Sequence, residues 1–376
     1  MRPEHPKISR LLLVIVSAVS FSHLKGQPPT AKAANYDYVA PQVAPSTAND
    51  LGMADIAAIL NETAPNPPYL VAYQLTTTDA TNTKASAAPL KVVPTDDAAH
   101  PYLGVFHNQI NTTQFATYLG YSSNLSAWHT LGQIHSPASQ PDMRMLADDS
   151  VLYAEEYNPS GRPYVRIQYY GNAGLTGLQA LIANPAVTPT TAMTMPGTLL
   201  AKADGTPEFG RISYDGAIAS STTEINHHYY DLGQRDLDAV GTLTNFKNWL
   251  SSADTVLNDL VTNAGGNGKI GDREIFKVGS QVYEIVEAQV HPASPNDYGS
   301  WRLFLINRTT SAIQQLSPAL AGGAQSLGNP TVSFVTLPPP TPGVAGAPAL
   351  VFTCFVFGAN NGTTRPGEHI FVYPLP

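Results

Sequence analysis

The chain has 376 residues, of which 43% are hydrophobic and 13% charged, and its formal net charge is −8. This length and hydrophobic content suffice for a sizeable core in one or two domains, while the acidic balance and the lack of a Lys/Arg-rich run argue against nucleic acid as a partner. Cys354 is the only cysteine, so an intrachain disulfide is excluded, and its apolar neighbours predict a small residue buried in the core.

The N-terminus indicates export. A basic start, "MRPEHPKISR", precedes the apolar run "LLLVIVSAVSF" at 11–21, which is too short to span a bilayer core of about 30 Å but matches the apolar part of a signal peptide. We expect 1–33 to be a signal peptide and leader, and the mature protein to be secreted, extracellular and free of the membrane; an uncleaved anchor is the alternative. In a eukaryotic secretory pathway, glycans could be attached at the sequons that begin at Asn61, Asn111, Asn124, Asn307 and Asn361.

Residues 34–66 are rich in Ala, Pro and Thr and predict a loosely ordered N-terminal arm. A short helix is expected within 47–63, with Thr47 or Asn49 as its cap. From 67 onward, short aromatic and β-branched runs separated by turn residues predict strands. Helical periodicity is confined to 176–184 and 243–262. Strands and helices do not alternate, so a parallel α/β sheet is not expected.

The predicted strands repeat. Turn-plus-polar starts recur as "SQPDMRML" at 139, "GTPEFGRI" at 205, "IGDREIFK" at 270 and "LGNPTVSF" at 327, with spacings of 66, 65 and 57 residues. A unit of about 60 residues holding about four strands fits a propeller blade. We therefore predict an all-β fold, a five-bladed β-propeller with about four antiparallel strands per blade. Its blades are expected at 67–138, 139–204, 205–269, 270–326 and 327–376. A β-sandwich of several sheets is the alternative.

Acidic and arginine side chains stand together at three of these starts. Residues two apart on a strand face the same side, so Asp142 with Arg144, and Asp272 with Glu274, can point together into a central funnel. Arg273 then faces the other side, and Glu208 and Arg211, three apart, need a turn between them to meet. Structural ion pairs between inner strands are the alternative. The three groups are Asp142 with Arg144, Glu208 with Arg211, and Asp272 with Arg273 and Glu274.

The run "TYLGYSSNLSAWHTLGQI" at 117–134 and the polar starts "QPDMRM" and "TPEFGRI" resemble the five-bladed β-propeller glycoside hydrolases, a group of arabinanases, xylosidases, arabinofuranosidases and fructosidases. The resemblance covers most of 67–376 in architecture. It implies Glu208 as the general acid and Asp142 as the aspartate that orients it. The group's first-blade aspartate has no match in "NPPYLVAYQL" at 66–75, so the base is sought among Asp272, Glu274 and Glu287.

Glycoside cleavage needs one protonated carboxyl group and a second, ionised one. Our first hypothesis is accordingly a secreted glycoside hydrolase, a monomer acting on a plant or fungal oligosaccharide or polysaccharide. The second is a non-catalytic propeller that binds carbohydrate or protein. The expected substrate-binding residues are Arg144, Arg211, Arg273, His107, Trp301 and Tyr298.

No cofactor is expected, although propellers that this chain resembles can hold a structural calcium ion. No loop has the ligand spacing that calcium demands. The stretch "EINHHYYD" at 224–231 is not expected to bind a metal, because adjacent histidines on a strand face opposite sides.

Overall fold

The computed structural model describes most of the chain from Ala44 to Pro376, and all of the described residues belong to one compact unit, Tyr36–Pro376. The leader expected at 1–33 and the helix expected at 176–184 lie outside the described residues. The described ranges are 44–78, 84–95, 97–111, 114–145, 151–157, 164–170, 191–194, 212–214, 224–230, 236–242, 250–253, 255–267, 270–291, 298–318, 326–339, 346–358 and 365–376.

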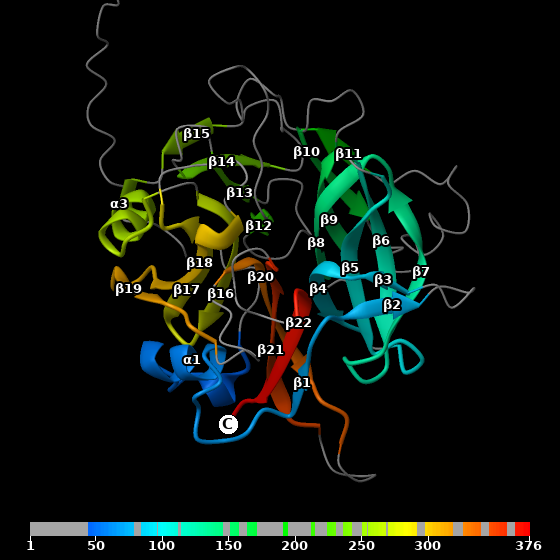
Figure 1. Cartoon of the computed structure of the whole chain (residues 1–376), viewed down its shortest axis with the longest axis horizontal. Coiled ribbons are helices and arrows are strands. Elements are labelled where there is room, and N and C mark those ends of the chain that lie inside the picture. Colours follow the sequence, from blue (N-terminus) through cyan, green and yellow to red (C-terminus); the bar gives the residue numbers. More distant parts are fainter. Residues whose placement is uncertain are drawn as a thin grey trace, which may run out of the picture. The chain divides into compact units, whose positions relative to one another are not determined.

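The described strands form five separate sheets around a common centre (Figure 1), which confirms the predicted five-bladed β-propeller. Four sheets have four strands each, and the sheet of the first blade in chain order has six. Neighbouring strands are antiparallel, except that β2 runs parallel to β7.

The first two blades are built from consecutive strands. Blade 1 contains β4 (Ala88–Pro94), β5 (Tyr102–Gln109), β6 (Phe115–Ser122) and β7 (Trp128–His135), extended by β2 (Thr76–Thr78) and β3 (Lys84–Ser86). Blade 2 contains β8 (Ala138–Met145), β9 (Val151–Tyr157), β10 (Tyr164–Tyr170) and β11 (Thr191–Thr194).

Blades 3 and 4 follow the same order. Blade 3 contains β12 (Ile212–Tyr214), β13 (Glu224–Tyr230), β14 (Asp236–Thr242) and β15 (Leu250–Ala253). Blade 4 contains β16 (Ile270–Val278), β17 (Gln281–Gln289), β18 (Trp301–Asn307) and β19 (Ala312–Gln315), with the short helix η4 (Tyr298–Ser300) before β18.

Blade 5 combines both ends of the described chain. Its strands are β20 (Leu327–Thr336), β21 (Pro348–Val356), β22 (Gly367–Pro374) and β1 (Leu70–Ala72). Leu70 pairs with Val372 and Ala72 with Ile370. Residues 70–72, which lie within the range expected for the first blade, therefore close the last one, and the ring is joined through hydrogen bonds between distant strands.

The first strand of each blade is the inner one. β4 lies against both β20 and β8, and β16 lies against β20. In Figure 1 the labels β4, β8, β12, β16 and β20 lie toward the middle, whereas β7, β15 and β19 lie outside. Side chains from the inner strands of different blades can therefore meet at the axis.

The N-terminal segment from Ala44 is packed, so the expectation of a loosely ordered arm is wrong for that part. After the short helix η2 (Ser46–Ala48), helix α1 (Met53–Leu60) confirms the predicted helix. It buries Ile56, Ala57, Ile59 and Leu60 in one core cluster with side chains of blades 4 and 5. Each fully buried aliphatic side chain stabilises the fold by about 1.5–3 kcal/mol, which outweighs the segment's polar composition.

The predicted caps of this helix were wrong. Gly52 is the N-cap, and its backbone N–H donates to Asp55 Oδ2 at 2.8 Å. Thr47 instead lies within η2. In the described part of the helix expected at 243–262, 250–253 is the strand β15 and helix α3 spans Thr255–Asn263.

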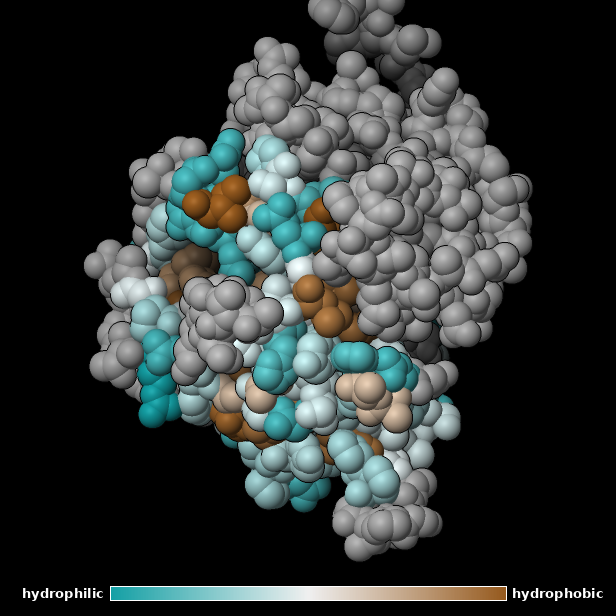
Figure 2. All heavy atoms as spheres, turned by 90° about the vertical axis from the view of Figure 1, so that its right-hand side faces the viewer, coloured by the Kyte–Doolittle hydropathy of each residue, from teal (hydrophilic) through white to brown (hydrophobic). Residues whose placement is uncertain are grey.

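The apolar side chains of the sheets pack into hydrophobic cores between and beside the blades. Cys354 is fully buried, as predicted, and Trp128 is buried with its indole N–H donated to the carbonyl of Leu125. On the face shown in Figure 2, hydrophobic atoms of the coloured residues form separate small patches among hydrophilic ones. Among the described residues, no helix has the length and apolar character needed to cross a membrane.

Candidate ligand site at the bulged end of the inner strands

Four inner strands share the same irregularity. Each advances three residues while its partner strand advances two, which defines a β-bulge. The bulges end at Lys91 in blade 1, Asp142 in blade 2, Arg273 in blade 4 and Thr331 in blade 5. These four residues therefore occupy corresponding positions. Bulges are common beside binding and active sites because they redirect side chains.

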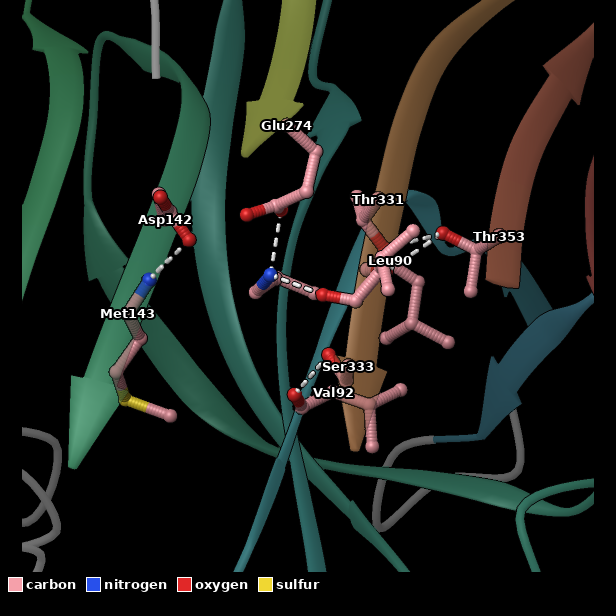
Figure 3. A network of polar contacts seen from close by, with 10 residues as sticks. Leu90, Val92, Asp142, Met143, Glu274, Thr331, Ser333 and Thr353 are labelled. Atoms are coloured by element: carbon pink, nitrogen blue, oxygen red, sulfur yellow. Dashed lines mark hydrogen bonds and ion pairs between the residues drawn. The ribbon is translucent and has the colours of Figure 1, made fainter. Parts of the chain in front are cut away.

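The first blade has a lysine where the second has an aspartate. Lys91 Nζ lies 2.5 Å from Glu274 Oε2 and donates to the carbonyl of Val332 at 2.7 Å. Both charged side chains are fully buried. Figure 3 shows Glu274 between Asp142 on one side and Thr331 on the other. Glu274, nominated for catalysis, thus neutralises a buried ammonium group and ties blade 4 to blade 1.

Glu287, also nominated for catalysis, accepts backbone hydrogen bonds from two blades. Its Oε1 accepts the N–H of Asp272 at 3.0 Å, and its Oε2 accepts the N–H of Asn329 at 2.6 Å. A Cβ at Gly271 or at Gly328 would collide with this carboxylate. Two glycines therefore make room for a buried carboxylate that joins blades 4 and 5.

Glu284 lies on the same strand and has a different partner. Its Oε2 is 3.1 Å from Nη1 of Arg308, and both side chains are fully buried. Burial lowers the pKa of the Arg308 guanidinium to about 9. Glu284 therefore stabilises the interior of blade 4 rather than the axis.

Asp142 and Asp272 remain as buried carboxylates at the bulges. Asp142 Oδ1 accepts the backbone N–H of Met143 at 2.8 Å, and only 2% of the residue is exposed. Asp272 is 3% exposed and belongs to the bulge of blade 4. Both lie beneath the molecular surface at the same end of the inner strands.

Hydroxyl groups fasten blade 5 to blade 1 next to these acids. Thr331 and Thr353 both donate to the carbonyl of Leu90, at 3.0 and 2.8 Å, and Ser333 donates to the carbonyl of Val92 at 2.6 Å (Figure 3). Because these groups are buried and satisfied within the protein, this part of the axis is structural.

Backbone N–H groups at the bulges donate hydrogen bonds to side chains of the preceding blade. We call each such contact an interblade joint. Glu287 accepts from Asn329, and Glu368 Oε1 accepts from Leu90 at 3.0 Å. At the joint between blades 1 and 2, His107 Nδ1 accepts the N–H of Gln140 at 3.0 Å.

Partly exposed side chains lie in and beside these joints, and together we call them the surface row. Gln140 Nε2 contacts Asn329 Oδ1 at 3.4 Å, which brings blades 2 and 5 together. The row is extended by aromatic pairs, Tyr298 with Phe357 at 5.2 Å and His107 with Phe115 at 4.7 Å between ring centroids. The surface row comprises Tyr298, Phe357, Asn329, Gln140, His107 and Phe115.

The nominated residues fall into four groups. His107 and Trp301 lie at the bulged end of their strands, with Tyr298 in η4 just before β18, and Asp142, Asp272, Glu274 and Glu287 are buried beneath that end. Arg144 and Arg273 lie on β8 and β16, but the structure describes only their backbone. Glu208 and Arg211 lie outside the described residues.

Sequence reasoning missed Lys91, Gln140 and Asn329. A signal was present for two of them, since Gln140 and Asn329 each precede a proline at the start of a repeat. Both have positive φ values, 48° and 49°, a left-handed conformation that is uncommon for residues other than glycine. Strained residues at equivalent positions of two blades often mark a functional site.

The described residues do not fit the calcium ion that the resemblance implied. No three His, Cys, Asp or Glu side chains among them gather as metal ligands would. Glu274 is paired with the ammonium group of Lys91.

Five sheets around a polar axis, with a surface row at one end, define a five-bladed β-propeller. No family model and no curated protein matches the sequence. Solved structures do match. One is an N-acetylgalactosamine deacetylase from F. plautii in complex with blood group B trisaccharide, at 12% identity and a TM-score of 0.45, covering 81% of this chain and 94% of that chain.

Two glycoside hydrolases of the kinds that the sequence resembles also match. An endo-arabinase from Bacteroides thetaiotaomicron is 11% identical with a TM-score of 0.44, covering 81% of this chain and 98% of that chain. An alpha-L-arabinofuranosidase from Podospora anserina in complex with cellotriose is 8% identical with a TM-score of 0.43, covering 81% of this chain and 96% of that chain. The fold assignment rests on the chain's own five sheets.

Proposed function

We propose that the protein binds carbohydrate across the surface row. The observation that carries this proposal is the combination of partly exposed aromatic rings with partly exposed amides at the bulged end of the inner strands. Aromatic faces pack against the C–H groups of sugar rings, and amides exchange hydrogen bonds with sugar hydroxyls. Tyr298 is the most exposed ring of the row, at 46%.

The amide of Gln140 supports a ligand rich in hydroxyl groups. Its Oε1 is shielded from solvent and has no hydrogen-bond donor among the described residues. An unsatisfied buried carbonyl oxygen costs about 1–3 kcal/mol. A sugar hydroxyl would reach this oxygen after the Gln140 amide turns toward the surface, and the resulting hydrogen bond would remove that cost.

Binding is tested with neutral oligosaccharides of plant and fungal origin, by calorimetry on the full chain. We expect Tyr298→Ala and Asn329→Ala to weaken binding at least tenfold. Tyr69→Ala is the matched control, because Tyr69 is equally exposed at 54% but adjoins Val372, at the opposite end of blade 5. Equal losses in all three variants, or none in the first two, would refute the surface row as the site.

Hydrolysis is the second candidate, and the buried carboxylate of Asp142 at the bulge favours it. In a hydrolytic mechanism, Glu208 would donate the proton and Asp142 would orient Glu208. Glu274 and Glu287 hold blades together, so Asp272 is the nominated residue that remains as the base. Release of reducing sugar from the bound polysaccharide measures this activity. Glu208→Gln should lower the rate at least a hundredfold with binding retained. If the wild type binds the polysaccharide but releases no product, hydrolysis is refuted and the protein is a binding module.

We also propose that the protein is exported as a monomer after removal of 1–33, on the basis of its basic start and short apolar run. N-terminal sequencing of protein recovered from the culture medium tests the cleavage, and light scattering tests the monomer. Retention of Met1 in membrane-bound protein would contradict export.

A further inference from the structure

The three described interblade joints differ in one chemical respect. Glu287 and Glu368 are carboxylates, which accept hydrogen bonds whenever they are ionised, whereas the acceptor between blades 1 and 2 is the imidazole of His107. Carboxylates ordinarily stay ionised from pH 5 to 8, and histidine is the side chain that ordinarily changes charge in that range. Among the described joints, the His107 joint is therefore the one whose acceptor ordinarily changes charge near neutral pH.

The contact fixes the protonation state of the ring. A backbone N–H can only donate, so Nδ1 of His107 must present its lone pair to Gln140 and the ring proton must reside on Nε2. The doubly protonated ring carries hydrogen on both nitrogens. Protonation of Nδ1 would point a second N–H at the N–H of Gln140. Two donors cannot form a hydrogen bond with each other, so the joint would be lost.

Gln140 would not keep its position without the joint. Its φ of 48° lies in the left-handed region, where a residue with a side chain is strained by an amount on the order of 1 kcal/mol. The hydrogen bond that the Gln140 N–H donates to Nδ1 of His107 holds this conformation. The same residue contacts Asn329 across the axis, so its movement would separate the two amides of the surface row.

The groups around His107 do not supply another acceptor for Gln140 in the described contacts. Thr117 and His135 project from the same face of blade 1, in register with His107. Both contact Glu155 of blade 2: Thr117 donates to Oε2 at 2.9 Å, and His135 Nδ1 is 2.8 Å from Oε1. Tyr153 also donates to Glu155, at 2.7 Å, and Asp142 accepts from Met143. Phe115 is the ring beside His107.

We propose that His107 is a positioning residue that makes ligand binding at the surface row depend on pH, through its hydrogen bond to the backbone of Gln140. The neutral ring holds the binding conformation and the protonated ring releases it. This inference rests on the proposed function for the ligand, but the joint itself can be measured without one.

The joint is tested by NMR on the deuterated, ¹⁵N-labelled full chain between pH 5 and 8. We expect the Gln140 amide resonance to move in one titration step, and the Asn329 amide, whose acceptor is a carboxylate, to stay constant. His107→Gln keeps an acceptor oxygen but cannot titrate, so the Gln140 step should vanish. In His135→Gln the step should remain. A constant Gln140 resonance in the wild type, or a step that persists in His107→Gln, would overturn the proposal.

Ligand affinity is measured over the same range with an oligosaccharide that binds at pH 8. Since only the neutral form binds, wild-type affinity should fall by about tenfold per pH unit below the midpoint, and affinity of His107→Gln should stay level. A parallel fall in both proteins would overturn the regulatory role. If no oligosaccharide binds at any pH but the Gln140 step is present, the carbohydrate assignment fails and the pH-sensitive joint stands.

Discussion

Lys91 and Glu274 form a buried ion pair between the first and the fourth blade, with 2.5 Å between Nζ and Oε2, although they are 183 positions apart in the chain. Lys91 also donates to the carbonyl of Val332 in blade 5. One ammonium group thus connects three blades at the axis. This contact gives Glu274 a structural role, because the buried charge of Lys91 would be energetically costly without a partner.

Replacing Lys91 by Met should destabilise the protein by about 3–5 kcal/mol, because Glu274 would remain buried without its partner. The double variant Lys91→Met/Glu274→Met should recover most of that loss, because both buried charges are then removed. Urea unfolding measures each free energy. A double variant as unstable as Lys91→Met alone would show that the pair matters for more than its charges.

Gly271→Ala should destabilise the fold by about 1–3 kcal/mol, since its new methyl group would collide with Oε1 of Glu287. Glu287→Ala removes that carboxylate, so the two substitutions should be less costly together than the sum of their separate effects. A double-mutant cycle in urea measures the coupling. Strict additivity would mean that the glycine is needed for some other reason.

Leu60→Ala should cost about 2–5 kcal/mol, because the side chain is buried in the core that α1 shares with blades 4 and 5. The control is Val256→Ala, on the exposed face of α3, where the change should stay within about 0.5 kcal/mol. Thermal and urea unfolding both report the difference. Equal stability of the two variants would indicate that the N-terminal segment does not belong to the cooperative fold.

Glu62→Gln should stabilise the protein at pH 8 and have little effect at pH 4. Glu62 follows α1 with a φ of 58°, and its Oε2 is buried without a hydrogen-bond donor among the described residues. Burial raises the pKa of this carboxyl group above its ordinary 4.5. The stability that its protonated form contributes is complete below pH 4.5 and is lost as pH rises through the raised folded-state pKa. Glutamine mimics the protonated form at every pH.

The comparison of Glu62→Gln with the wild type separates this effect from a second one. Burial lowers the pKa of His369, so its neutral form contributes stability that is lost as pH falls through the folded-state value. His369 is present in both proteins, and its contribution cancels in their difference. Melting temperatures recorded from pH 4 to 8 give that difference, and a constant offset over the whole range would contradict the assignment to Glu62.

Much of the architecture could be predicted from local pattern. The starts at 139, 270 and 327 coincide with the beginnings of β8, β16 and β20, within one residue. A polar turn followed by alternating or continuous apolar residues specifies a strand through contacts close in sequence. The same holds for α1, whose apolar spacing predicts one buried face.

The candidate site was predicted only in part. His107 and Tyr298 were expected to bind a ligand and lie in the surface row, and four acids were expected near the axis and are buried there. Their partners were not predictable, because Glu287 meets the backbone of Asn329 and Glu274 meets Lys91 from distant blades. A pattern along one strand shows which face a charge occupies but not what the opposite blade presents to it.

By itself, the sequence determined the strands, their turns, the buried faces and the number of repeats, because these depend on the alternation and spacing of neighbouring residues. Only the tertiary structure decided that β1 completes the C-terminal blade, that the first blade has a lysine where the second has Asp142, and that a histidine holds Gln140 in place. These features follow from closure of the ring, which brings residues far apart in the chain within hydrogen-bond distance and out of contact with water.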